Sequence, residues 1–149
     1  MNFRVIFFGI FFIFIHANIA NTIENKILFK VNNEIITSLD IFSEMKYLRT
    51  INDEFKNIEK EKAFEISKNS IIREKIKELE IKRVIKKIEI EDKILNNLII
   101  SYFKEFEIST IVEFENFFLN KDIDPNVIKK KISIEVLWNQ LIYSRYNQN

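Results

Sequence analysis

The chain has 149 residues and carries 23 basic and 22 acidic side chains, which gives a net charge of +1 at neutral pH. This balance excludes the strongly basic surface with which proteins attract nucleic acid or anionic membranes, so we expect no nucleic-acid partner. The absence of cysteine excludes disulfide bonds and thiolate metal sites, and it is compatible with an oxidising compartment.

The first 20 residues have the layout of a secretory signal peptide. A single basic residue, Arg4, precedes the unbroken apolar run of residues 5–15, and a small residue, Ala20, ends the segment. The run is shorter than the roughly 20 residues that span a membrane, and a retained anchor is the alternative. We expect cleavage after Ala20, which leaves one domain over residues 21–149 and restricts membrane contact to export.

Residues 27–42 read ILFKVNNEIITSLDIF and begin with the pattern of a β-hairpin. Residues 26–31 alternate around Ile27, Phe29 and Val31 as in a half-buried strand, and residues 34–36 form a second short apolar segment. Asn32 and Asn33 lie between the two segments. Asparagine tolerates a positive φ better than other non-glycine residues, so this pair predicts a two-residue turn.

A helix start follows the hairpin directly. Thr37 or Ser38 can act as the N-cap, and Asp40 in the first turn suits the positive end of the helix dipole. The apolar spacing predicts the first helix over residues 38–50. Residues 52–62 are highly charged and fit either a loose connection or the opening of the next helix.

Apolar residues at three- and four-residue spacing predict further helices in the middle of the chain. A long helix is expected over residues 64–88, with two apolar stripes on nearly opposite sides. Either its two ends pack against different neighbours, or the helix bends near Glu80. Residues 91–106 form the most clearly amphipathic segment and predict the third helix.

Two start signals predict the last two helices. Thr110 and Glu113 form a capping box that opens a short helix, and Asp124 followed by Pro125 opens a helix over residues 125–146. The expected inner face of the short helix consists of Ile111, Phe114, Phe117 and Phe118. The expected inner face of the last helix consists of Val127, Ile134, Leu137, Trp138 and Leu141. The predicted fold class is therefore mainly α, with a short N-terminal β-hairpin.

The acidic pairs Glu89/Glu91 and Asp122/Asp124 are the nearest match to an acid–base site. They lie beside lysines in charged stretches, which is typical of a solvated surface. Carboxylate metal sites in helical bundles usually include a histidine, and His16 of the signal segment is the one histidine in the chain. We expect no metal, no cofactor and no catalytic residue.

Residues 31–40, VNNEIITSLD, resemble the segment that opens the mature N-terminal domain of SurA-type periplasmic chaperones. The helical segments over residues 71–95 and 122–142 are similar to later parts of that domain, and the resemblance covers about residues 24–147. It implies a periplasmic protein that binds unfolded or nascent outer-membrane and envelope polypeptides, its clients, without ATP. The hairpin has two interpretations: it docks the N-terminus onto the helices, or its free edge accepts another strand. That strand is either the C-terminal segment with which the resemblance implies the domain is closed, or a client strand.

Many members of this family also carry a parvulin-type peptidyl-prolyl isomerase domain, and no segment of this sequence matches that domain. The enzymatic assignment is therefore uncertain. Two alternatives to a chaperone stay open: an N-terminal fragment of an isomerase whose catalytic domain is missing from this chain, and a structural helical protein without clients.

Six aromatic residues at helical spacing have two interpretations. Large apolar residues at such positions usually form the core, which is the structural interpretation. In the functional interpretation, some of them line a groove for unfolded chain segments. The candidates for client contact are Phe103, Phe106, Phe114, Phe117, Phe118 and Trp138.

Overall fold

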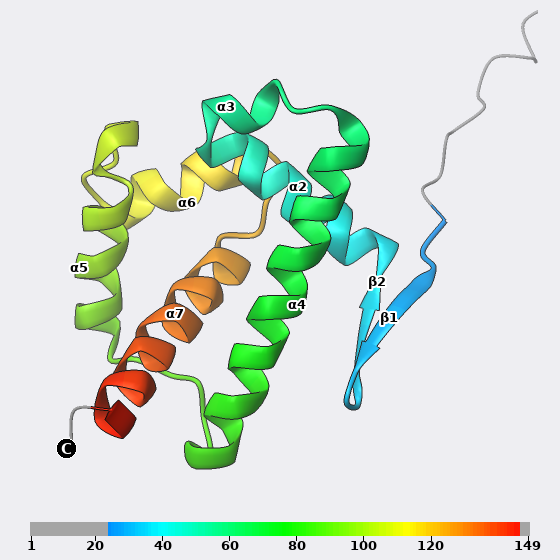
Figure 1. The fold of residues 1–149 in the computed structure, drawn as a ribbon. Helices are drawn as coiled ribbons and strands as arrows, with labels where there is room; N and C mark the ends of the chain where they lie inside the picture. The colour runs from blue at the N-terminus through cyan, green and yellow to red at the C-terminus, as the bar shows by residue number, and fades with distance from the viewer. Residues whose placement is uncertain (1–23, 147–149) are drawn as a thin grey trace, which may run out of the picture.

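The computed structural model describes residues 24–146, which form a helical bundle with a two-stranded hairpin at its N-terminal side (Figure 1). The predicted fold class, mainly α with a short N-terminal β-hairpin, is confirmed. The expected signal segment, residues 1–20, lies outside the described residues. Within residues 24–146, no helix combines the length and the apolar character that crossing a membrane requires.

The hairpin consists of strand β1, Ile27–Val31, and strand β2, Glu34–Thr37, which pair antiparallel. Asn32 has the positive φ, 53°, that a tight two-residue turn requires, so the predicted turn is confirmed. The register shifts by one residue around Leu28, as in a β-bulge. Ile36 is the one fully buried side chain of the two strands, and it fixes the hairpin against the helices that follow.

Helix α2, Ser38–Ile51, begins where β2 ends. Thr37 is its N-cap: the Thr37 hydroxyl accepts a hydrogen bond from the N–H of Asp40 at 3.3 Å, and the Asp40 carboxylate accepts one from the N–H of Thr37 at 2.8 Å. Ser38 is the first helical residue instead, and its hydroxyl donates a hydrogen bond to the carbonyl oxygen of Glu24 at 2.9 Å. These hydrogen bonds hold the hairpin at a fixed position on α2.

Helix α3, Asp53–Lys56, is a single turn that leads into helix α4, Lys60–Val84. The predicted bounds of this long helix, residues 64–88, are wrong at both ends. The helix begins earlier because Ala63 is buried against α2 and α3. It ends at Val84: Ile85 is extended, with φ −120° and ψ 127°, and Ile85, Ile88 and Ile90 pack against the cluster around Ile81 without being helical.

The two ends of α4 pack against different neighbours, as one of the two alternatives predicts. Ile71 packs beneath the hairpin, whereas Ile81 packs against helix α7, Pro125–Tyr146. Helix α4 is continuous through Glu80. It lies alongside α7 and also packs against α2, so it connects the hairpin and α2 with the last helix of the bundle (Figure 1).

The third predicted helix, residues 91–106, is shorter in the structure. Helix α5, Asp92–Tyr102, gives way to a 3₁₀ turn, η1, Lys104–Phe106. Glu107 follows with a positive φ of 61°, which ends the helical run and turns the chain toward the next helix.

Both remaining start signals are confirmed. The hydroxyl of Thr110 accepts a hydrogen bond from the N–H of Glu113 at 3.1 Å at the start of helix α6, Ile111–Leu119. Helix α7 begins at Pro125, and proline suits this first position because an N–H there would have no acceptor within the helix.

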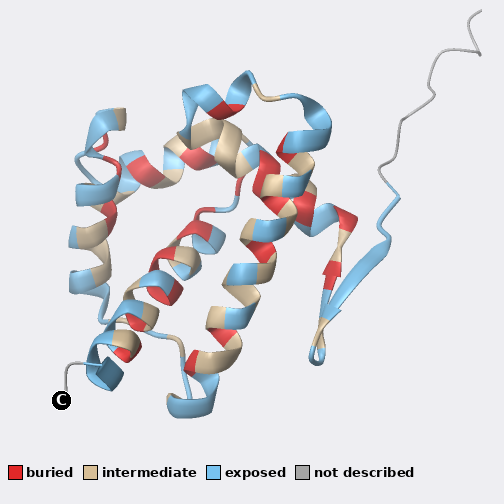
Figure 2. Cartoon of the chain, viewed as in Figure 1, coloured by how far each residue is buried: buried red, intermediate tan, exposed pale blue. Residues whose placement is uncertain are grey.

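The largest core cluster lies between α5, α6 and α7, and the buried positions of α7 run along its inner side (Figure 2). Its buried residues are Ile99, Phe103, Ile108, Phe114, Phe118, Ile123, Ile128 and Ile132. Val127, which the sequence pattern places on the inner face of α7, is exposed. The other predicted inner-face residues, Ile134, Leu137 and Leu141, are buried and Trp138 is half-buried, whereas at the start of the helix Ile128 and Ile132 are buried in place of Val127.

Candidate functional site: the hairpin surface and the α2 groove

The hairpin exposes a group of apolar side chains. Ile27 and Ile35 are exposed to 68% and 48%, and Leu39 in the first turn of α2 is exposed to 50%. Leu28 and Phe29 are exposed as well, Phe29 on the face that carries Ile36 and opposite the face of Ile27 and Ile35, and we call these five residues together the hairpin surface. A group of exposed large apolar side chains is typical of a binding surface.

The sheet also has free edges among residues 24–146, because it contains two strands. Four of the five residues of β1 are exposed, and Figure 2 shows this strand almost entirely in the colour for exposed residues. The ammonium group of Lys68 on α4 lies 5.5 Å from the centre of the Phe29 ring and covers part of the side of the hairpin that faces the helices. A free edge of this kind can accept a further strand through its backbone N–H and C=O groups.

Three neighbouring hollows lie around α2. The first, of about 390 Å³, lies between α2, α4 and α7; the second, of about 650 Å³, lies beside α3; and the third, of about 260 Å³, lies at the start of α4. The first two share Ser43, Lys46 and Asp122, and the last two share Phe42 and Met45. We call the three hollows together the α2 groove.

Helical periodicity explains how α2 lines the second hollow. Leu39, Phe42, Lys46 and Arg49 recur every three or four positions and therefore lie on one side of the helix. These positions are not among the predicted site residues, because an apolar stripe interrupted by Lys46 and Arg49 has the pattern of a solvated helix face. The sequence signal for them is the pair Leu39 and Phe42, two large apolar residues on this side of the helix.

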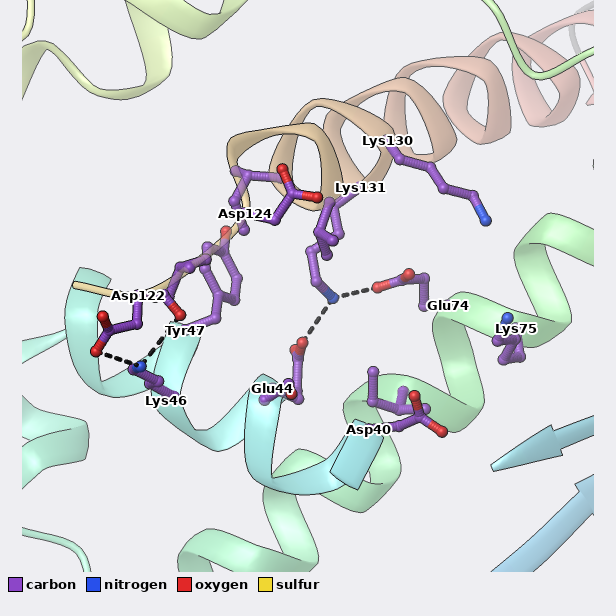
Figure 3. Close-up of a pocket in the computed structure, with 15 residues that line it drawn as sticks. Asp40, Glu44, Lys46, Tyr47, Glu74, Lys75, Asp122, Asp124, Lys130 and Lys131 are labelled. Carbon is purple, nitrogen blue, oxygen red and sulfur yellow. Dashed lines mark hydrogen bonds and ion pairs between the residues drawn. The ribbon is translucent and has the colours of Figure 1, made fainter. Parts of the chain in front are cut away.

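Figure 3 shows the wall of the first hollow, where Lys131 of α7 lies between two carboxylates. Its Nζ is 2.6 Å from Oε2 of Glu44 on α2 and also contacts Glu74 on α4. The hydroxyl of Ser70 donates a hydrogen bond of 2.7 Å to the other oxygen of Glu44. The ring centre of Tyr47 lies 5.4 Å from Lys131 Nζ. This network joins the three helices that form the hollow.

The protonation states of this wall are fixed at neutral pH. Burial raises the pKa of the Tyr47 hydroxyl to about 12, and the charge of Lys131 opposes this only in part. Burial alone would lower the pKa of Lys131, but the carboxylates of Glu44 and Glu74 outweigh it and raise that pKa above its usual value. Tyr47 is therefore neutral and Lys131 charged, so neither is poised to transfer a proton near pH 7.

A second buried carboxylate, Glu78 on α4, is surrounded by three lysines. Its Oε1 lies 2.8 Å from Nζ of both Lys82 and Lys130, and its Oε2 lies 3.5 Å from Nζ of Lys75. Burial would raise the pKa of Glu78, but the hydrogen bonds from Lys130 and Lys82 and the charge of Lys75 lower it to about 2. Glu78 therefore joins α4 to α7 as a permanent anion at neutral pH.

The five phenylalanines predicted as candidates for client contact lie together, in and beside the largest core cluster, which also contributes Ile123 and Ile128 to the first hollow. Phe103, Phe114 and Phe118 are buried in the largest core cluster, with ring centres 5.0–5.3 Å apart. Phe106 and Phe117 are half-buried at the border of this cluster, with ring centres 5.5 Å apart. The structure thus brings the five rings into one group, most of which faces inward.

The sixth candidate, Trp138, lies apart from this group, half-buried against the cluster around Ile81. None of the six candidates lines the α2 groove. Contact with clients stays a prediction for the rings that remain partly accessible.

The predicted acidic pairs lie in different surroundings. Asp122 has a positive φ of 49°, and its carboxylate forms an ion pair with Lys46 Nζ at 3.3 Å. The carboxylate of Asp124 accepts a hydrogen bond from the N–H of Asn126 at 2.9 Å. Glu89 pairs with Lys87 at 3.2 Å. Across the described part of the chain, no group of three or more His, Cys, Asp or Glu side chains is arranged to hold a metal ion.

Comparisons with known proteins add no relative. No protein-family model matches the chain, and neither the curated proteins nor the solved structures give a match to it.

Proposed function

We propose that this chain is a periplasmic, chaperone-like protein of the SurA type that binds unfolded outer-membrane or envelope polypeptides without ATP. The single observation that carries this proposal is the hairpin surface, with five exposed apolar side chains over residues 27–39 next to a free strand edge. Passive binding of unfolded chains needs exposed apolar area and backbone hydrogen-bonding groups, and it needs no catalytic residue. The resemblance of residues 31–40 to the opening segment of SurA-type chaperones supports the same function.

The charge distribution is consistent with such a role. Many of the surface charges are paired with one another, as for Lys77 with Glu135 at 2.5 Å and Lys129 with Glu115 at 2.6 Å. A surface on which charges are paired attracts nucleic acid only weakly.

The test is suppression of aggregation. A chemically denatured outer-membrane β-barrel protein is diluted into buffer with residues 21–149 at a near-equimolar amount, without ATP, and light scattering is followed. We expect the wild-type protein to lower the scattering. The double variant Ile27→Ser/Ile35→Ser should lower it less, because it removes apolar area from the hairpin surface.

The matched control is Val112→Ser/Leu119→Ser, which changes two exposed apolar residues of α6, far along the chain from the hairpin. This variant should suppress aggregation as well as the wild type does. Unchanged scattering with the wild-type protein would contradict the proposal and favour a structural role. Equal losses in the two double variants would show that the hairpin surface is not the binding surface.

A further inference from the structure

We propose that the α2 groove binds an extended, uncharged segment of the client, with one large apolar side chain in the first hollow. This inference rests on the proposed function and assigns to it a second contact region, distinct from the hairpin surface. It follows from the size of the hollow, its floor, its charges and its continuity over α2.

The first hollow is large enough to hold a large apolar side chain, and its floor is apolar. Its volume of about 390 Å³ lies near the lower end of the range for ligand sites, roughly 300–1,000 Å³. Ile71, Ile123 and Ile128 form its apolar floor, and Val127 lies at its rim, half exposed. Such a floor favours an aliphatic or aromatic group.

The charges around the hollow select against a charged occupant, because they already have partners. Lys131 is held by Glu44 and Glu74, and Lys46 pairs with Asp122 at 3.3 Å. A charged ligand would have to compete with these pairs, and a buried charge that loses its partner is strongly destabilising.

The other two lysines at the hollow are engaged in the same way. Lys130 lies 2.8 Å from Glu78, and Lys75 lies 3.5 Å from both Glu34 and Glu78. The carboxylate of Asp40 accepts the hydrogen bonds of the α2 cap. An uncharged apolar side chain is therefore the occupant that fits without breaking an existing pair.

The groove continues from the first hollow in a way that suits an extended chain. The second hollow shares the Lys46–Asp122 ion pair with the first and adds Leu39 and Phe42. Arg49 also lines it, and its Nε is buried without a hydrogen-bond acceptor among residues 24–146. A carbonyl oxygen of a bound chain would provide that acceptor without adding charge.

The hairpin surface and the groove are adjacent, since Leu39 belongs to both. Lys75, at the edge of the first hollow, also contacts Glu34 at the start of β2. A client segment can therefore contact the hairpin and the groove at the same time. Two linked contacts strengthen the binding of one chain more than either does alone.

The test compares two short, uncharged, fluorescently labelled peptides of serine, threonine and glutamine that differ at the central position, phenylalanine or alanine. Fluorescence anisotropy measures their binding to residues 21–149. We expect the phenylalanine peptide to bind about ten-fold more tightly, as burial of one large apolar side chain predicts. Equal binding of the two peptides by the wild type would overturn the inference.

Val127→Trp places a large ring at the rim of the hollow and should abolish the preference for phenylalanine. Val127 is 50% exposed, so the fold can accommodate the change; Val112→Trp on α6, at a position 65% exposed, is the matched control and should keep the preference. Val127→Asp, which adds an unpaired charge at the same rim, should also lose the preference. Circular dichroism checks that each variant is folded, and a preserved preference in either Val127 variant would overturn the inference.

The aggregation assay separates this inference from the proposed function. If the wild type suppresses aggregation while Val127→Trp keeps the peptide preference, the groove assignment is wrong and the chaperone proposal stands. If the wild type does not suppress aggregation, the chaperone proposal is wrong, whatever the peptides show. A preference that Val127→Trp abolishes and Val112→Trp retains supports the groove.

Discussion

Asn32 occupies the most constrained backbone position of the hairpin. Its φ of 53° is unfavourable for most residues with a side chain, whereas asparagine and glycine tolerate it. We expect Asn32→Ala to lower the free energy of unfolding by about 1 kcal/mol, and Asn32→Gly to leave it unchanged or slightly higher. Urea denaturation measures both. Asn33→Ala is the control, because Asn33 has no positive φ, and equal losses in the two alanine variants would contradict the interpretation.

Glu78 makes the stability of the protein depend on acidic pH. Its pKa in the folded state is about 2 against 4.5 in the unfolded chain, so the stabilisation is complete above pH 4.5 and is lost as the pH falls toward 2. The whole shift corresponds to about 3 kcal/mol. We expect urea denaturation at pH 7 and at pH 3 to show a large part of this loss in the wild type.

The variant Glu78→Gln removes the titrating group, so its stability should change much less between these two pH values. Glu61→Gln changes an exposed carboxylate at the start of the same helix and should leave the pH dependence of the wild type intact. The same pH dependence in Glu78→Gln as in the wild type would assign the effect to other groups.

At the scale of the elements, local sequence signals determine where helices start. The capping boxes of α2 and α6 each join a threonine to an acidic residue three positions later. We expect Thr37→Ala to lower the free energy of unfolding by about 1 kcal/mol, measured by thermal denaturation. Thr50→Ala, which removes a hydroxyl bonded within α2 itself, is the control and should cost less. A smaller loss for Thr37→Ala than for Thr50→Ala would contradict the role of the cap.

These start signals are the part of the fold that the sequence predicted well. The turn at Asn32, the cap of α6 and the start of α7 at Pro125 all depend on residues within a few positions of each other. The ends of α4 and α5 depend on distant contacts instead. Ala63 extends α4 because α2 covers it, and no local pattern contains that information.

The α2 groove was less predictable for the same reason. Its walls come from α2, from α4 and from the start of α7, and the ion pair between Glu44 and Lys131 joins residues far apart in the chain. Periodicity identifies the side of α2 that carries Leu39 and Phe42, but it does not show that other helices form walls around them. The six aromatic candidates were chosen for size, which is also the property that places residues in a core.

At the scale of the whole molecule, the packing is uneven. The cluster between α5, α6 and α7 contains eight buried residues, and the cluster beneath the hairpin contains three, Ile36, Ile41 and Ile71. The hairpin surface therefore lies on the part of the molecule with the smaller core. Regions with few buried apolar contacts open more readily than the rest of a domain.

Native-state hydrogen exchange should reveal this difference directly. Amides of β1 that pair with β2 are expected to exchange through local opening, at rates well above those of amides in the middle of α7, which exchange only in larger unfolding events.

Ile36→Ala should increase exchange in the hairpin and leave α7 nearly unchanged, because Ile36 is the one fully buried side chain of the two strands. Ile128→Ala, in the largest cluster, should instead increase exchange throughout the described fold. Equal protection of β1 and α7 in the wild type would contradict this prediction, because it would mean that the hairpin and the bundle unfold as one unit. The edge of β1 would then be as rigid as the bundle when a client strand binds.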